Sequence, residues 1–231
     1  MTHVLFFFDY KPFIAIIGDI KSSKEIENRS SVQKQLQKVL DAINNTYQAE
    51  IASNFMITLG DEFQGLLKSG APVTHIIETI EREMSPITLR FALGVGDITT
   101  DIQSAMPLGA DGPAYYLARD AISHLKSTEK KKMEPKNNIE IRIKQHEELS
   151  ALLNAIFSLL FVIKESWTAR QAEIIHTYLQ GDGTQAGTAK ALGIHQPNVQ
   201  QALAAADFYA YRDALKTIDN ILSEIKEADD V

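Results

Sequence analysis

The feature that most constrains this chain is a change of hydrophobic pattern near Ile143. Up to that residue, short apolar segments typical of β-strands alternate with segments whose apolar residues recur at helical spacing. From residue 144 to the end, the spacing is helical throughout. We therefore predict an α/β domain over residues 1–143 and a helical domain over residues 144–231, with residues 145–165 as the helix that connects them.

The order of elements in the first domain favours an α+β fold. Apolar runs predict five strands, at residues 13–17, 55–59, 63–67, 87–95 and 139–143. Apolar residues at helical spacing predict three helices, at residues 32–43, 73–80 and 114–125. Gly60 and Asp61 separate the second and third strands, which indicates a hairpin turn. Helices packed on one face of a mainly antiparallel sheet fit this order best.

The composition predicts a cytoplasmic protein with no membrane association. The chain has no cysteine, which excludes thiolate zinc sites, iron–sulfur clusters and cysteine nucleophiles and fits a reducing compartment. Its N-terminus lacks a basic region, and its apolar runs are far shorter than the roughly 20 residues of a membrane-spanning helix. The net charge of −7 argues against broad, nonspecific binding of nucleic acid.

Two aspartates mark the candidate functional site. Asp19 follows the first strand directly, and Asp61 lies at the tip of the hairpin. If their strands are neighbours, both carboxylates project from one edge of the sheet. A divalent cation bound with a nucleoside triphosphate would relieve their repulsion. The plainer interpretation is that each Gly-Asp pair forms a turn, or that the Asp caps a following helix.

Residues close to these aspartates in sequence could bind the phosphates of such a ligand. Ser22 and Ser23 could cradle a phosphate with their N–H groups. Arg29 could reach a triphosphate from the start of the first helix, although a solvated arginine is the commoner situation there. Glu62 is a weaker alternative metal ligand, because continued strand pairing would turn it to the face opposite Asp61.

Several motifs resemble those of known families. Those that resemble class III nucleotidyl cyclases are FIAIIGDI at 13–20, TLGD at 58–61, LRFALGVG at 89–96 and a following helix with Arg119. GDEF at 60–63 is similar to the signature of diguanylate cyclases, which share that core fold. GDEFQG at 60–65 and GADGPAYYLAR at 109–119, followed by a helix-turn-helix, resemble the SatD family over nearly the whole chain. The resemblance implies a ferredoxin-like, nucleotidyl-cyclase-type antiparallel sheet.

The cyclase resemblance also implies particular roles. Asp19, Asp61 and the carbonyl of Ile20 would hold Mg²⁺ or Mn²⁺. Arg119 would stabilise the negative charge that the phosphates carry in the transition state. Because the site of such cyclases forms between two subunits, a twofold homodimer is implied.

The chain departs from active cyclases at two positions. Tyr115 stands where they have an Asn, one helical turn before the Arg, and Ile57 stands where they have the Lys that contacts adenine. A degenerate or repurposed nucleotide site therefore fits at least as well as ATP cyclisation. Without the resemblance, Arg119 is most simply a surface arginine paired with Asp120 or Glu129.

The second domain has the spacing of a helix-turn-helix over about residues 166–206. Thr168 and Thr184 are the expected N-caps of its first two helices, and Gly193 marks the turn before a third helix that starts near residue 196. The exposed side chains of the third helix would be Gln196, Asn198, Gln200 and Gln201. Asn and Gln can pair with adenine in the major groove of DNA.

The charge of this region leaves its partner open. Residues 166–218 contain four basic and four acidic side chains, so one such unit would bind DNA weakly and would need to dimerise. A three-helix scaffold for protein contacts fits equally well. Two functions remain. One is a regulator that senses a nucleotide or another anion and contacts DNA or a partner. The other is a metal-dependent nucleotidyl cyclase or transferase that uses Asp19, Asp61 and Arg119 on a nucleoside triphosphate.

Overall fold

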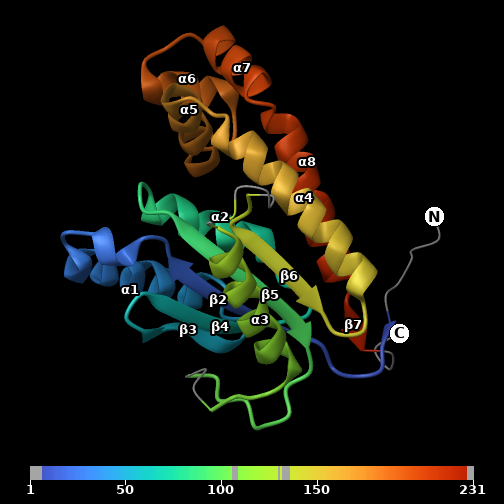
Figure 1. Ribbon diagram of the computed structural model, residues 1–231. Coiled ribbons are helices and arrows are strands. Elements are labelled where there is room, and N and C mark those ends of the chain that lie inside the picture. The colour runs from blue at the N-terminus through green and yellow to red at the C-terminus, as the bar shows by residue number, and fades with distance from the viewer. Residues whose placement is uncertain (1–6, 106–108, 130, 132–135, 228–231) are drawn as a thin grey trace.

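A five-stranded sheet forms the centre of the molecule. The computed structural model describes residues 7–105, 109–129, 131 and 136–227. The strands are β2 (Phe13–Ile20), β3 (Ile51–Leu59), β4 (Glu62–Lys68), β5 (Leu89–Gly96) and β6 (Ile139–Ile143). Their order is β3-β4-β2-β5-β6, with β5 and β6 parallel and the other neighbours antiparallel. The predicted α+β class with a mainly antiparallel sheet is confirmed (Figure 1).

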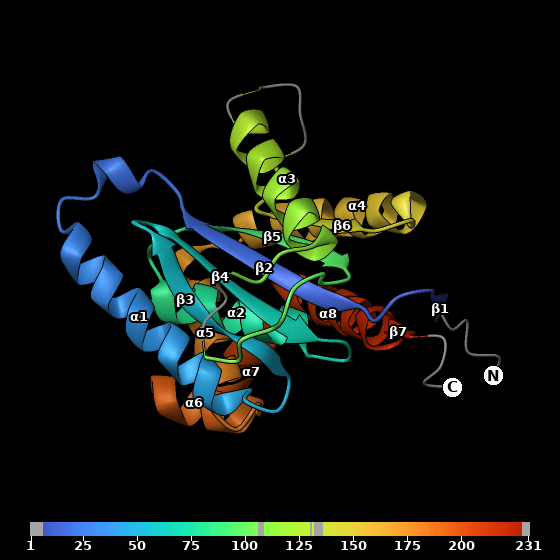
Figure 2. The same ribbon diagram turned by 90° about the horizontal axis from the view of Figure 1, so that it is seen from below.

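The helices cover both faces of this sheet. They are α1 (Arg29–Thr46), α2 (Val73–Met84), α3 (Pro113–Thr128), α4 (Glu147–Glu165), α5 (Ala169–Gln180), α6 (Gln185–Leu192), α7 (Gln196–Ala205) and α8 (Phe208–Ser223). Helices α1 and α2 pack on the face to which Ile14 and Ile16 point, whereas α3 packs on the opposite face, against Ala15 and Ile17 (Figure 2).

The expectation of helices on one face thus holds for α1 and α2 but not for α3. The physical reason is that apolar spacing identifies the buried side of a helix but not the face of the sheet on which it packs. Small residues bring α3 close to β5. A Cβ built on Gly94 would lie only 2.0 Å from the carbonyl oxygen of Ala114, so the contact depends on glycine at that position.

The helices that follow the sheet divide into two groups. Phe157 of α4 and Leu215 and Ile218 of α8 belong to the main apolar core beside α1 and α2. Helices α5, α6 and α7 have a small core of their own, built from residues such as Ile175, Val199 and Leu203 (Figure 1). The region expected to form a separate helical domain therefore includes two helices that complete the core of the sheet.

Local sequence signals account for the boundaries of the three small helices. Thr168 forms a capping box with Gln171 at the start of α5, and the Thr184 hydroxyl caps α6. Gly193 has φ = 63° and ends α6, a left-handed conformation that costs glycine little. Both N-caps and the position of the turn match the sequence prediction.

Two short strands join the ends of the described chain. β1 (Phe7–Phe8) and β7 (Lys226–Glu227) pair in parallel at one end of the molecule (Figure 1). A single 3₁₀ turn, η1 (Ser23–Glu25), leads from β2 to α1.

No individual helix in the described part of the chain combines the length and apolar character needed to cross a membrane. Helices α4 and α5 meet those criteria only when counted together, and they are bent by 115° from one another.

Candidate functional site

Asp19 lies at the end of β2, on the face of the sheet that α3 covers. The residue is 4% exposed, and its carboxylate contacts a guanidinium nitrogen of Arg90 on β5. The ammonium of Lys126 on α3 lies 2.8 Å from its other oxygen. Both oxygens of this buried carboxylate are therefore paired with cations that belong to the protein.

Glu62, rather than Asp61, shares this face with Asp19. The two residues are directly opposite in the pairing of β2 with β4, and directly opposed residues point to the same face. Arg119 of α3 lies 2.5 Å from one oxygen of Glu62, and Lys126 lies 3.7 Å from the other. Arg119 of α3 thus pairs with Glu62 on the sheet and not with its helical neighbours.

A third carboxylate completes this ion-pair cluster at the end of α3. Glu129 contacts the second guanidinium nitrogen of Arg90 and lies 3.5 Å from Lys21. Partial burial on its own would raise the pKa of Glu129, but the hydrogen bond and charge of Arg90, together with Lys21, lower it. Among the described residues, the Nε of Arg90 has no hydrogen-bond partner although it is buried.

Asp61 lies beside this cluster but has different contacts. Its backbone oxygen accepts a hydrogen bond of 3.1 Å from the N–H of Ile20, which places the end of β2 beside the hairpin turn. Its carboxylate accepts a hydrogen bond from the hydroxyl of Ser23. Ser22, with φ = 49°, precedes this contact, and Arg29 lies near Gly60 at the turn. The two aspartates therefore lie at the same end of the sheet, but their carboxylates have different partners.

These residues do not form a ready metal site. In the described part of the chain, no group of three or more His, Asp or Glu side chains is placed to hold a metal ion. A cation at Asp19 would have to displace Lys126, the more exposed of its two partners. The four cations of the cluster, Lys21, Arg90, Arg119 and Lys126, are matched in number by its three carboxylates together with the neighbouring Asp61.

The two positions that depart from active cyclases lie in apolar surroundings. Tyr115 packs into the small core between α3 and the sheet, and its hydroxyl is buried without a partner among the described residues. Burial raises the pKa of this hydroxyl. Ile57 packs against the main core. Neither side chain contributes a polar contact to the ion-pair cluster.

Sequence reasoning did not identify Arg90 and Lys126 as site residues. A signal for each exists. Arg90 is a charged residue inside an otherwise apolar strand, and Lys126 lies seven residues after Arg119, which places both on one side of α3. Their shared partners come from distant strands, and that pairing depends on the register of β2 with β4 and β5.

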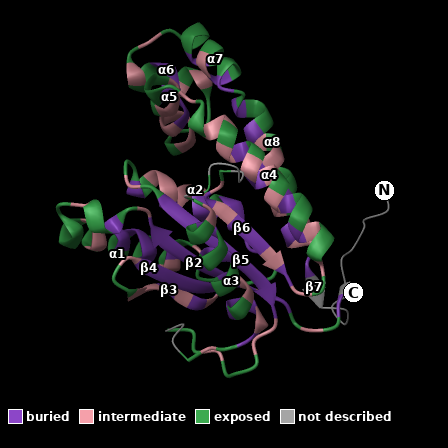
Figure 3. Cartoon of the chain, in the orientation of Figure 1, coloured by how far each residue is buried: buried purple, intermediate pink, exposed green. Residues whose placement is uncertain are grey.

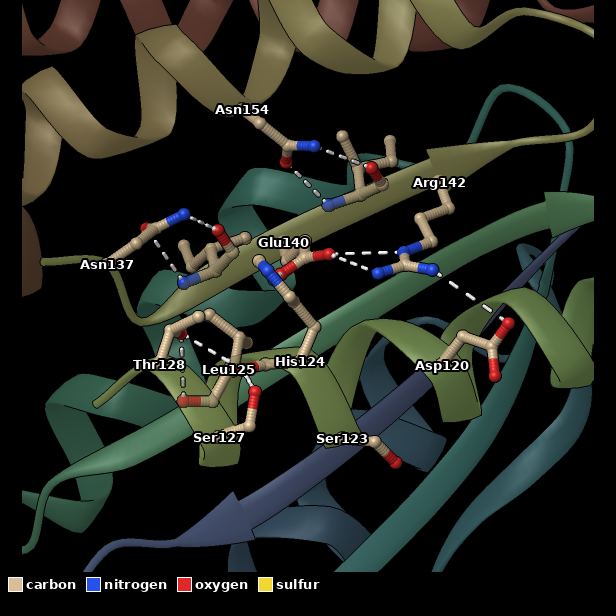
Figure 4. A network of polar contacts seen from close by, with 12 residues as sticks. Asp120, Ser123, His124, Leu125, Ser127, Thr128, Asn137, Glu140, Arg142 and Asn154 are labelled. Atoms are coloured by element: carbon tan, nitrogen blue, oxygen red, sulfur yellow. Dashed lines mark hydrogen bonds and ion pairs between the residues drawn. The ribbon is translucent and has the colours of Figure 1, made fainter. Parts of the chain in front are cut away.

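A second polar network joins α3 to the edge strand β6 (Figure 4). Glu140 lies 2.6 Å from the Nδ1 atom of His124 and 3.0 Å from Arg142, and Arg142 lies 3.8 Å from Asp120. Glu140 is buried, so the guanidinium of Arg142 compensates its charge, and His124 adds a hydrogen-bonding contact. This network fixes α3 to the sheet on the side away from Glu62.

The four polar residues predicted to face DNA all lie on the exposed side of α7. They are Gln196, Asn198, Gln200 and Gln201. Asn198 and Gln201 border a shallow groove that also contains Arg170 of α5. Arg170 pairs with Glu173 at 2.5 Å, so the groove carries little net charge.

The fold and the ion-pair cluster define an α+β protein in which a mainly antiparallel sheet carries charged residues under α3 and is extended by a helical region. The sequence pattern that describes the SatD family matches residues 13–222. The chain therefore belongs to the SatD family, and the predicted family resemblance is confirmed.

Similarity to solved structures is low. A bacterial light-regulated adenylyl cyclase has a TM-score of 0.43 and 11% identity, over 57% of this chain and 75% of that one. The catalytic core of a rhodopsin-guanylyl cyclase with converted specificity, in complex with ATPαS, has a TM-score of 0.34 and 18% identity, over 52% of this chain and 73% of that one. The guanylate cyclase domain of RhGC from Catenaria anguillulae, in complex with GTP, has a TM-score of 0.34 and 17% identity, over 49% of this chain and 74% of that one. No match was found among curated proteins.

Proposed function

We propose that this SatD-family protein is a cytoplasmic, homodimeric regulator. In this proposal the α/β region senses a nucleotide, and the α5–α7 unit contacts DNA. The observation that carries it is the attachment of α8, which leaves the α5–α7 unit and packs on α2. The carboxylate of Asp219 accepts hydrogen bonds from the N–H and the hydroxyl of Thr74, at 2.9 and 2.6 Å, and Arg212 pairs with Glu78 at 2.9 Å. Movement of the sheet region would therefore be passed to α5–α7.

The junction leaves room for such movement. A cavity of about 270 Å³ lies where α2, α4, α5 and α8 meet, and Glu81, Lys164, Trp167 and His176 are among its lining residues. This pocket is partly open to solvent rather than enclosed in the interior, and it leaves α5 space to shift relative to α2. Lys21 lines the same cavity and also pairs with Glu129 in the ion-pair cluster. This residue supports a physical connection between the cluster and the junction.

The proposed ligand of the cluster is a nucleoside triphosphate or a related anion. Arg119 is half exposed and Lys126 is 42% exposed, so both cations are accessible to phosphate. Ser22, Ser23 and Arg29 lie on the neighbouring turn and are the proposed additional phosphate contacts.

The α7 surface is the proposed DNA contact. Gln196, Asn198, Gln200 and Gln201 are exposed together on one helix, which suits reading of base edges in the major groove. Because the unit has little net positive charge, its affinity would depend on two copies binding together. A protein surface in place of DNA is the alternative partner.

The alternative function is a metal-dependent nucleotidyl cyclase. It is favoured by the hydrogen bond between Ile20 and Asp61, which puts Asp19 and Asp61 at one end of the sheet. In that case Asp19, Asp61 and the Ile20 carbonyl would hold Mg²⁺ or Mn²⁺, which would supply charge neutralisation for the phosphates. Arg119 would then contact the phosphates during catalysis.

Calorimetric titration of ATP and GTP, with and without Mg²⁺, tests the nucleotide proposal. We expect binding without metal, and about tenfold weaker binding in Arg119→Gln, since a charge-assisted hydrogen bond contributes about 1.5 kcal/mol or more. Lys38→Gln, an exposed change of the same charge on α1, is the control. Binding that requires Mg²⁺, is lost in Asp61→Ala and releases pyrophosphate would instead support the cyclase.

Gel shift at low and moderate salt tests the DNA proposal. We expect Gln200→Ala with Gln201→Ala to weaken retardation, whereas Gln180→Ala, an exposed glutamine on α5, leaves it unchanged. If neither promoter fragments nor random DNA are retarded at any salt concentration, the α7 surface does not bind DNA and a protein partner takes its place.

A further inference from the structure

Helix α4 has an apolar face that no other part of the described chain covers. Between Leu149 and Ile163 the helix contains no charged residue. Leu152, Leu159 and Val162 are 55%, 65% and 61% exposed, and they make up half of the six strongly exposed large hydrophobic residues in the described structure. In Figure 3, α4 lies at the margin of the molecule and has exposed as well as buried residues along its length. A contiguous apolar surface of this kind marks an interaction site.

Contacts on the opposite side of α4 hold the helix in an orientation that leaves this apolar face exposed. Asn154 accepts a hydrogen bond from the N–H of Ile141 and donates one to its carbonyl, at 2.8 and 2.9 Å, and so occupies the free edge of β6 (Figure 4). The hydroxyl of Ser150 accepts from the N–H of Ile143 at 2.9 Å. Phe157 packs into the core. The helix therefore cannot rotate to bury Leu152 and Leu159 without breaking these contacts.

The exposed residues have the spacing of a helix–helix seam. Leu152, Ala155, Leu159 and Val162 follow one another at intervals of three, four and three residues, the alternation that keeps one stripe against a partner helix. Ala151 and Ser158 border this stripe. Small residues beside the large ones allow two helices to approach within the usual interaxial distance of about 8–10 Å.

The symmetry of the stripe identifies a second copy of this chain as its partner. A twofold interface must be complementary to itself. Leu152 and Leu159 are equidistant from the point between Ala155 and Ile156. Two antiparallel α4 helices that cross there would place Leu152 against Leu159 of the partner subunit. The same pairing sets the two helix dipoles antiparallel, which is the favourable arrangement.

We infer that the protein dimerises through antiparallel packing of α4 on α4 of a second copy. The exposed apolar side chains offer on the order of 500 Å² per chain, so the pair would bury about 1,000 Å², near the lower limit of specific interfaces. The dimer is therefore reversible and concentration-dependent. The inference supplies the interface for the homodimer in the proposed function, but it requires neither nucleotide nor DNA.

This geometry has a consequence that does rest on the proposed function. A 19-residue helix is about 28 Å long, and α5 begins shortly after its C-terminal end. An antiparallel pair therefore places the two α5–α7 units at opposite ends, at a separation comparable with the roughly 34–36 Å between successive major-groove sites. Loss of the dimer should then weaken DNA binding, whereas loss of DNA binding should leave the dimer intact.

Sedimentation velocity of the full chain over a range of concentrations tests the dimer. We expect a monomer–dimer equilibrium in the wild type and at least a tenfold higher dissociation constant in Leu159→Glu. Leu59→Glu, which alters a residue 77% exposed on the hairpin, should leave the equilibrium unchanged. Circular dichroism and thermal melting test whether the variants fold. If Leu159→Glu does not fold, Leu159→Ser is the milder variant to use in its place.

The absence of cysteine permits a test of orientation. In an antiparallel pair, Ala155→Cys lies beside its own copy and should form a disulfide-linked dimer under mild oxidation. Glu148→Cys lies near the end of the helix, on the order of 20 Å from its copy, and should not. Cross-linking of both variants would indicate a parallel pair. A monomeric wild type would overturn the inference, and so would a Leu159→Glu dimer of unchanged affinity. Monomers that float with lipid vesicles would show that the face binds membranes instead.

Discussion

The two faces of the central sheet differ in kind, although the same strands supply both. On the side of α1 and α2, β2 contributes Ile14, Ile16 and Ile20 to a large apolar core. On the side of α3, the intervening positions are Ala15, Ile17 and Asp19. One face is packed with large aliphatic and aromatic side chains, and the other combines small residues with buried ion pairs.

This difference shows which face stabilises the fold and which face carries the candidate function. Burial of apolar side chains is the main source of stability, whereas a buried ion pair is often no more stabilising than apolar residues of the same shape. The charges of Asp19, Glu62 and Arg90 on the α3 face are therefore poorly explained by stability. Functional sites are where buried, strongly coupled charges concentrate.

The largest effect is expected from the apolar face. Phe91 is fully buried and packs edge-on against Phe63. Phe91→Ala should reduce the free energy of unfolding by about 3–5 kcal/mol, because it leaves a cavity in the main core. Urea denaturation measures this change. Tyr116→Ala, at an exposed aromatic position, is the comparison and should change stability little.

A smaller loss of stability is expected when the cationic partner of the ion pairs is removed and the carboxylates remain. Arg90→Leu removes the buried partner of Asp19 and Glu129 and should cost about 3 kcal/mol. Adding Asp19→Asn should restore part of the loss, since it removes the charge of a buried carboxylate that is left with Lys126 as its one cationic partner among the described residues. If the double variant is as unstable as the single one, the ion pairs contribute to stability directly and the contrast between the faces is wrong.

The close packing of α3 should be the next most sensitive feature. Gly94→Ala introduces a methyl group that meets the backbone of α3 at Ala114, and overpacking of this kind costs about 1–3 kcal/mol. Because the clash pushes α3 away from the sheet, nucleotide affinity should fall together with stability. Gly70→Ala, where a Cβ would contact nothing but φ is 81°, has a cost of backbone strain without a clash and should leave nucleotide affinity unchanged.

The elements that depend on local sequence were predictable. The apolar run that ends at Asp19, the caps at Thr168 and Thr184 and the turn at Gly193 follow from the chemistry of neighbouring residues. The side of the sheet that α3 covers was not, because apolar spacing is the same for either face. The partners of Asp19 and Arg119 were also beyond local signals, since they are brought together by strand register.

Helix α4 shows a different limit of sequence reasoning. Its uncharged run from Leu149 to Ile163 identifies a helix that packs on something. The contacts of Asn154 with β6 decide which side is used internally, and they leave the other side exposed. A hydrophobic pattern alone cannot divide one helix between an internal and an external partner.

The smallest effect is expected from acid titration of the ion-pair cluster. The folded-state pKa of Glu129 is lowered, so the unfolded chain binds more protons as the pH falls below about 4.5, and the stabilisation is lost as the pH falls through the folded pKa. Glu129→Gln should therefore reduce the loss of stability as the pH falls below about 4.5, measured by denaturation at each pH. Glu165→Gln, an exposed change of equal charge, is the comparison.

Hydrogen exchange of the full chain, with and without saturating ATP or GTP, tests whether nucleotide binding on the α3 face changes α2 and α8. We expect slower exchange at the end of β2 and in the last turns of α3, together with a change in the amides of α2 and α8 where Thr74 and Asp219 join them. Protection confined to the α3 face, with α2 and α8 unchanged, would contradict coupling between the two regions. If exchange is unchanged at every amide, the protein does not bind ATP or GTP and the nucleotide proposal is wrong.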